Sequence, residues 1–245
     1  MYAYSYDQFD KAQASGATCP VARDEAGSVI YGANGEPMPM YYDYNGTKYA
    51  FTGGDAIYED VNHDGSIDQY DVVYLGSSLP KLTGGFGFRL FYKGWSLNAQ
   101  FNYRYGNKIA NVARMRAENM HGADNQSTAV NYRWRKEGDG ANGGHVLPRA
   151  LYGQGYNWMG SDRFVEDGSF LRLNYLQFSY GFDSKLIKRI GLSRLNLYVS
   201  GENLFCLTKY SGVDPEVNYG DMGVTKDEAI TPRAKSFTFG LTATF

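Results

Sequence analysis

Residues 95–106 alternate between apolar and polar side chains almost without interruption, and no other feature of the chain constrains the fold as strongly. The apolar set is Trp95, Leu97, Ala99, Phe101, Tyr103 and Tyr105. The polar set is Ser96, Asn98, Gln100, Asn102 and Arg104. A period of two residues over this length predicts a β-strand. The polar face is too continuous for a sandwich core, and it is typical of the wet interior of a membrane barrel.

Four further segments show the same period and are predicted to be strands: Gly84–Tyr92, Ser169–Phe182, Arg194–Phe205 and Lys235–Phe245. The connections at Lys93-Gly94 and Asp183–Ser193 are short. Those at Asn107–Gly168, with one helical turn expected near Ile109–Asn119, and at Cys206–Ala234 are long. Outer-membrane barrels show this asymmetry, with short periplasmic turns and long extracellular loops. We therefore predict an all-β fold class, an antiparallel transmembrane β-barrel segment of about five C-terminal strands with long extracellular loops.

Five strands do not close a barrel, because the smallest outer-membrane barrels have about eight. An open sheet in lipid leaves backbone groups unpaired, at a cost of several kcal/mol for each group. The predicted barrel therefore needs strands from upstream of this chain. If the last strand ends in the periplasm, the long loops and the residues before Gly84 lie outside the cell.

The first 82 residues are polar and rich in turns, with hairpin signals at Asn34-Gly35 and Asn45-Gly46. We predict a small exposed meander there, with strands at Ser28–Tyr31, Met38–Tyr44 and Thr47–Phe51. The predicted domain organisation is an extracellular loop and meander region at 1–82, which contains an acidic loop at 60–71, followed by barrel strands at 83–245.

Composition excludes several classes of protein. No apolar run approaches 18 residues, which excludes a transmembrane helix but not a barrel, whose strands alternate. The aromatic content of 16% fits the aromatic girdles of outer-membrane barrels. The net charge of −2 says little about partners, and no basic tract suggests nucleic acid. Cys19 and Cys206 are read as isolated thiols rather than a disulfide, and Met1–Tyr4 lacks the features of a secretory signal.

The sharpest local motif runs from Asp60 to Asp71 and fits the calcium-loop pattern D-x-[DN]-x-[DN]-G. The predicted metal ligands are Asp60, Asn62, Asp64, Ser66 through its carbonyl, Asp68 and Asp71. Gly65 occupies the position of the sharp turn, and Ile67 is expected to anchor the loop inward. The aspartate at position 12 replaces the usual glutamate, as in dockerin-type loops. We predict a structural Ca²⁺ ion, against the alternative of an Asp/Asn/Gly-rich turn that binds nothing.

Signatures of an enzyme are missing from the sequence. The three histidines are scattered, and neither H-E-x-x-H nor G-x-S-x-G occurs. Glu166-Asp167 is read as a solvated loop end, because neighbouring strand residues point to opposite faces. The stretch Tyr132–Lys136 combines charge with aromatic rings and is either a ligand contact or, more commonly, a solvated loop face. We predict that the chain is not an enzyme.

Several segments resemble the C-terminal region of SusC/RagA-family TonB-linked outer-membrane proteins, also called TonB-dependent receptors. They are Gly54–Asp60, Leu75–Ser77, Pro80–Phe86, Phe164–Arg172, Gly201–Phe205 and Tyr210–Glu216, together with the aromatic Phe245. The resemblance runs from about Gly53 to the end of the chain. It implies a barrel of about 22 strands with an N-terminal plug. It also implies nutrient uptake driven by TonB through an N-terminal part that this chain lacks.

By the same resemblance, the partners are a SusD-like lipoprotein lid, outer-membrane lipid and an oligosaccharide, glycan or peptide substrate. The expected location is the Gram-negative outer membrane with a periplasmic C-terminus. The alternative is a secreted calcium-dependent glycan-binding β-module, in which the apolar strand faces pack into a core. A third reading, a hydrolase domain, lacks a nucleophile and a credible acid pair.

Overall fold

The computed structural model describes residues 2–4, 6–7, 20–136, 138–139, 147–216 and 224–245. The chain divides into two units. The first contains residues 1–76 and 110–166, and the second contains 77–109 and 167–245. This division differs from the predicted boundary at 82/83, because most of the first long connection folds with the N-terminal residues. The backbone N–H of Ala56, for example, donates to Oδ1 of Asn157 at 2.9 Å.

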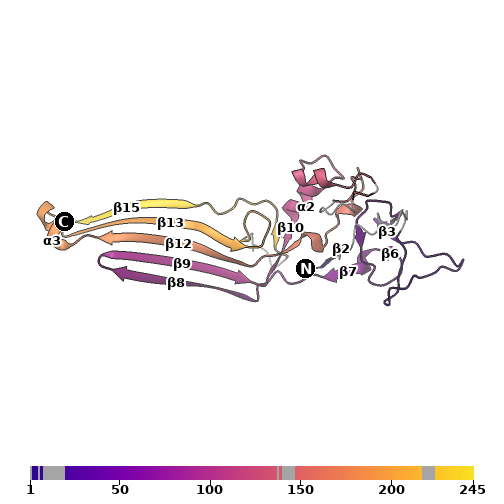
Figure 1. Cartoon of the computed structure of the whole chain (residues 1–245), viewed down its shortest axis with the longest axis horizontal. Coiled ribbons are helices and arrows are strands. Elements are labelled where there is room, and N and C mark those ends of the chain that lie inside the picture. The colour runs from indigo at the N-terminus through magenta and orange to yellow at the C-terminus, as the bar shows by residue number, and fades with distance from the viewer. Residues whose placement is uncertain (1, 5, 8–19, 137, 140–146, 217–223) are drawn as a thin grey trace. The chain divides into compact units, whose positions relative to one another are not determined.

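The second unit is built on a five-stranded antiparallel sheet with the order β15-β13-β12-β9-β8 (Figure 1). Its strands are β8 (Leu82–Tyr92), β9 (Trp95–Tyr105), β12 (Phe170–Gly181), β13 (Arg194–Thr208) and β15 (Ser236–Thr244). Each strand pairs with the next of these strands along the chain, so the sheet is an up-and-down meander. The five predicted strands are confirmed, although β13 continues three residues beyond the predicted end.

The turn between β8 and β9 fixes the register of this pair of strands. Lys93 and Gly94 have φ angles of 47° and 86°, the left-handed pair of a type I′ hairpin. The ladder that follows places Tyr92 opposite Trp95, Leu90 opposite Leu97 and Phe88 opposite Ala99.

Most of the large apolar side chains of the five strands lie on one face. Phe91, opposite Ser96, and Tyr198, opposite Ser179, lie on the other face. A typical row across the sheet contains Leu90, Leu97, Phe178, Val199 and Phe239. The adjacent row on the opposite face contains Arg89, Asn98, Gln177, Ser200 and Thr238. A bulge at Asn174 moves the apolar positions of β12 from odd to even numbers, so that Leu171, Leu173, Leu176 and Phe178 share a face. The predicted division between an apolar and a polar face is confirmed.

The first unit contains short elements around an aromatic core. They are β1 (Tyr2–Tyr4), β2 (Tyr6–Asp7), β3 (Tyr41–Tyr44), β4 (Thr47–Ala50), β5 (Ile57–Tyr58), β6 (Ser66–Ile67), η1 (Gln69–Asp71), β7 (Val72–Tyr74), α2 (Val112–Glu118), η2 (Thr128–Tyr132), η4 (Tyr156–Trp158) and η5 (Asp162–Phe164). β1 pairs with β7, β2 with β5, and β3 with both β4 and β6. The helical turn predicted near Ile109–Asn119 is confirmed as α2.

The remaining elements are β10 (Lys108–Asn111), β11 (Val165–Asp167), α3 (Ser184–Ile187), η6 (Lys188–Ile190) and β14 (Lys226–Asp227). Strands β11, β10 and β14 form a three-stranded sheet in that order. No helix among the described residues is long and apolar enough to cross a membrane.

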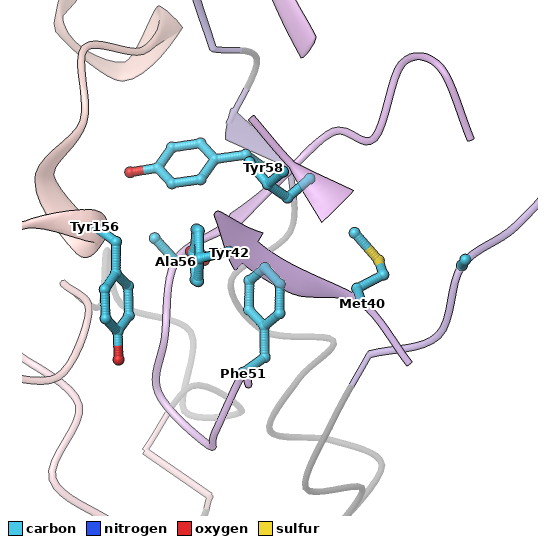
Figure 2. Close-up of a cluster of buried hydrophobic side chains, with 8 residues drawn as sticks. Met40, Tyr42, Phe51, Ala56, Tyr58 and Tyr156 are labelled. Carbon is cyan, nitrogen blue, oxygen red and sulfur yellow. The ribbon is translucent and has the colours of Figure 1, made fainter. Parts of the chain in front are cut away.

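Figure 2 shows the core of the first unit, where the aromatic rings of Tyr42, Phe51, Tyr58 and Tyr156 gather. The Tyr42 ring centroid lies 4.1 Å from that of Phe51 and 4.6 Å from that of Tyr156. The predicted Asn45-Gly46 hairpin is confirmed between β3 and β4, with φ angles of 53° and 74°. The predicted exposure of the meander is wrong, because Tyr42 and Phe51 are fully buried. The predicted strand at Ser28–Tyr31 contains only isolated bridges at Val29 and Tyr31.

Candidate functional site

The acidic loop from Asp60 to Asp71 adopts the backbone shape that its pattern predicts. Gly65 has a φ angle of 79°, in the region that favours glycine, so the chain turns sharply at position 6. Ile67 follows in β6 and is buried in the aromatic core of the first unit. The expected turn and the inward anchor are therefore both present.

The carboxylates at the two ends of the loop accept hydrogen bonds from the loop backbone. Asp60 accepts from the N–H of Gly65 at 2.8 Å and from that of Asp64 at 3.2 Å. Asp71 accepts from the N–H of Val61 at 2.9 Å and from that of Asp68 at 2.8 Å. These bonds hold the loop closed from both ends, and they leave further carboxylate lone pairs for other contacts.

The predicted ligands differ in exposure. Asp60, Ser66 and Asp71 are buried, Asp68 is half-buried, and Asn62 and Asp64 face solvent. Burial raises the pKa of Asp71, and the negative charge of Asp60 raises it further, while backbone N–H donors oppose both effects. The predicted donors are all oxygen atoms, and four of the residues are carboxylates. Such a set matches the chemistry of a hard cation. Within the described residues, however, no three acidic, histidine or cysteine side chains gather closely enough to hold a metal ion, so calcium stays a prediction.

A second cluster lies on the polar face of the sheet and was not predicted. Arg172 of β12 pairs through Nη2 with Oδ1 of Asp214, and its Nε lies 3.1 Å from Oε2 of Glu216. Glu216 also pairs with Arg233 at 3.0 Å and accepts from Nδ2 of Asn102 at 3.4 Å. The side chains of Arg172 and Asp214 are only 5% and 9% exposed. The cluster ties the segment after β13 to the middle strands of the sheet.

The segments that carry the family resemblance supply both halves of this cluster. Arg172 ends the Phe164–Arg172 segment, and Asp214 and Glu216 belong to Tyr210–Glu216. The residues pair across more than 40 positions of sequence, so no local spacing indicates the contact.

Other singled-out residues serve the fold. Trp134, within the Tyr132–Lys136 stretch, packs against Gly54, where an added Cβ would overlap its ring. Tyr132 and Arg135 remain exposed, so a ligand contact there stays a hypothesis. Glu166 accepts from Asn111 at 3.0 Å and pairs with Arg114. Cys206 is half-buried in β13, and Cys19 and His145 lie outside the described residues.

The buried ion pair generates a test of the cluster. Replacing Arg172 alone, as Arg172→Met, leaves the buried Asp214 carboxylate without its cationic partner and should cost about 3–5 kcal/mol of stability. Asp214→Leu should cost less, because Arg172 keeps its contact with Glu216 at 3.1 Å. The double variant should cost less than the sum of the two single changes. Unfolding of the detergent-purified protein in urea measures all three values.

Arg233→Met is the matched control. The Arg233 side chain is 54% exposed, and exposed ion pairs contribute about 0–1 kcal/mol. Equal losses for Arg172→Met and Arg233→Met, or strict additivity in the double variant, would contradict the assignment of a buried pair.

Comparison with known proteins gives one consistent group, although no family model matches the chain. TonB-dependent receptor P3 of Formosa agariphila is 30% identical over 199 residues, which are 78% of this chain and 19% of that protein. TonB-dependent receptor SusC of Bacteroides thetaiotaomicron is 27% identical over 222 residues, 88% of this chain and 18% of SusC. The chain therefore spans about a fifth of the length of these relatives.

A solved structure supports the same grouping. The RagAB peptide importer in its open-open state matches with a TM-score of 0.62 and 25% identity, over 78% of this chain and 21% of the matched chain. The register of the sheet, the sequence likeness to the curated receptors and this structural likeness agree. The chain belongs to the SusC/RagA-type TonB-dependent receptors.

Proposed function

We propose that this chain forms the C-terminal strands of an outer-membrane β-barrel that imports a nutrient. The observation that carries the proposal is the continuous apolar face of the five-stranded sheet, which stays exposed. Phe239 is 81% exposed, and the other large exposed side chains of this face include Phe86, Phe88, Leu90, Tyr92, Trp95, Phe178, Leu197, Phe237 and Leu241. Soluble proteins rarely expose apolar patches larger than a few hundred Å². Contact with the acyl chains of a lipid bilayer would cover this face.

The dimensions of the strands support a membrane setting. β8 and β9 each contain 11 residues. At about 3.4 Å per residue and a tilt of about 40°, such a strand crosses about 26 Å, close to the apolar band of outer-membrane barrels. Aromatic residues stand near both ends of the band, with Tyr92, Trp95 and Tyr180 at the turn end and Tyr103 at the other. This arrangement corresponds to the aromatic girdles of such barrels.

The opposite face supports a water-filled interior. Ser96 and Ser179 share a hydrogen bond of 2.6 Å there, and the Arg172 cluster covers the same face. Strands β8 and β15 stand at the two edges of the sheet. In lipid these edges need partners, which strands outside this chain would supply in the complete barrel.

The substrate and the partners are inferred from the proteins that this chain is similar to. The matched RagAB structure is named a peptide importer, and SusC is named a TonB-dependent receptor, so we infer uptake of a peptide or an oligosaccharide. The proposed partners are a SusD-like lipoprotein on the extracellular side and TonB, which would engage residues outside this chain. The short β8–β9 and β12–β13 connections would then lie in the periplasm. The first unit would be extracellular.

The alternative of a secreted calcium-dependent glycan-binding module fits the structure less well. That module would bury the apolar strand faces in a core. In the described residues these faces remain exposed, whereas the aromatic core of the first unit is closed. No described feature favours an enzyme over a transporter.

We also propose that the Asp60–Asp71 loop binds Ca²⁺ and that the ion stabilises the first unit. Support comes from the turn at Gly65, the buried anchor Ile67 and the raised pKa of Asp71, which a nearby cation would lower. Asp60, Asn62, Asp64, Asp68, Asp71 and the Ser66 carbonyl would hold the ion.

Calcium should therefore raise the stability of the intact receptor. At a concentration about 100 times its dissociation constant, Ca²⁺ should add about 2.7 kcal/mol, measured as a rise in the unfolding midpoint of the first unit after chelation and re-addition. Asp64→Ala should abolish this rise, and Asp43→Ala, a carboxylate on the neighbouring hairpin, should leave it intact. No rise in the unaltered protein would refute the proposed site.

The membrane proposal predicts opposite outcomes for two adjacent positions. Phe239→Arg places a charge on the apolar face and should cost about 2–4 kcal/mol at mid-membrane, with loss of receptor from the outer membrane. Thr238→Arg places the same charge on the polar face and should assemble normally. Quantitative immunoblots of outer-membrane fractions measure both variants, and equal assembly would count against a lipid-facing surface.

A further inference from the structure

The connection between β12 and β13 folds into a fixed turn at one end of the sheet (Figure 1). Helix α3 and the following η6 occupy it, and Ile187 is buried against the rest of the unit. Backbone hydrogen bonds join the N–H of Phe182 to the carbonyl of Leu195 at 3.0 Å and the N–H of Ser193 to that of Thr244 at 2.8 Å. The backbone of this turn is therefore held in place beside the sheet.

This turn exposes apolar and cationic side chains together. Leu186 is 62% exposed and Ile190 is 68% exposed. Lys185, Lys188 and Arg189 are exposed in the same two short helices. A segment with exposed Leu and Ile among basic residues is suited to the boundary between lipid headgroups and acyl chains.

Cations outnumber the anionic groups at this end of the sheet, where the Phe245 carboxylate also lies, 3.4 Å from Oγ of Ser193. Lys93 in the β8–β9 turn and Arg194 at the start of β13 add to the three cations of the turn. Asp183 is the one acidic side chain between residues 180 and 194. Lys185, Lys188 and Arg189 make no ion pair with any described carboxylate, in contrast to the paired Arg172 and Arg114 elsewhere.

An open apolar groove begins at this end of the sheet, where Trp95 follows the β8–β9 turn and Phe182 precedes α3. Its volume is about 670 Å³, and its lining includes Trp95, Phe178, Tyr180, Leu197, Phe239 and Leu241. Trp95 follows the β8–β9 turn directly, and its ring centroid lies 4.4 Å from that of Tyr180. The groove thus extends along the apolar face of the sheet from the end that carries the basic turn.

We propose that this end of the sheet binds an anionic glycerophospholipid. The phosphate would lie against Lys185, Lys188 and Arg189, and an acyl chain would occupy the groove. The inference rests on the proposed function, which places the apolar face in the outer membrane. Lipid A also carries phosphate, but the short connections are the periplasmic ones in the proposed orientation, and this selects the phospholipid leaflet.

The test uses the complete receptor purified in a non-ionic detergent. Phosphatidylglycerol, zwitterionic phosphatidylcholine and lipid A are titrated separately, and the thermal unfolding midpoint is followed. Phosphatidylglycerol should stabilise the receptor at lower concentration than the other two lipids.

The variant Lys185→Gln/Lys188→Gln/Arg189→Gln should need roughly a hundredfold more phosphatidylglycerol, from about fivefold for each cation removed. The variant Lys48→Gln/Lys136→Gln/Lys226→Gln, with the same change in charge at exposed sites, should behave as the unaltered receptor.

The apolar half of the site has its own variant. Leu186→Ser/Ile190→Ser should weaken stabilisation by phosphatidylglycerol and phosphatidylcholine by the same factor, because it removes contacts that do not depend on headgroup charge. An unchanged response to phosphatidylglycerol in the triple-glutamine variant, or stabilisation by lipid A alone, would overturn the proposal. Release of the receptor from membranes without detergent would instead contradict the proposed function, so the two failures are distinguishable.

Discussion

The cross-strand register of the five-stranded sheet is the constraint on which the second unit depends. A slip of one residue in any strand would move all of its apolar side chains to the polar face. The row from Leu90 through Phe178 to Phe239 is continuous because the Lys93-Gly94 turn fixes one pair of strands and the Asn174 bulge corrects the parity of β12. The exposed apolar face, the groove at its end and the polar face opposite all follow from this register.

The two faces of this sheet have different chemistry, and each is consistent with a transporter. On the polar side, the Arg172–Asp214 pair holds the segment after β13 against the middle strands, where it would narrow a water-filled interior. On the apolar side, large side chains have no covering layer among the described residues. A closed soluble module would need neither a buried ion-pair cluster on one face nor bare phenylalanines on the other.

Local sequence predicted the strands, the two type I′ hairpins and the shape of the acidic loop, because each depends on residues close together in the chain. It did not predict the Asn174 bulge, since Leu173 and Leu176 alone do not reveal where the parity changes. It placed Tyr42 and Phe51 in an exposed meander, because Tyr156, which covers Tyr42, lies more than 100 residues further on. The Arg172 cluster also depends on a distant segment. Occupation of the loop by Ca²⁺ stays a prediction, because no three acidic, histidine or cysteine side chains gather closely enough among the described residues.

The central claim is that alternate residues of β15 face lipid and water. Nitroxide spin labels placed singly at positions 236–239 and 241 of the membrane-embedded receptor test it directly, through their collisions with apolar oxygen and with a water-soluble nickel complex. The account predicts that labels at 237, 239 and 241 collide preferentially with oxygen, and that those at 236 and 238 collide preferentially with the nickel complex. Equal accessibility at all five positions, or uniform protection as in a packed core, would contradict it.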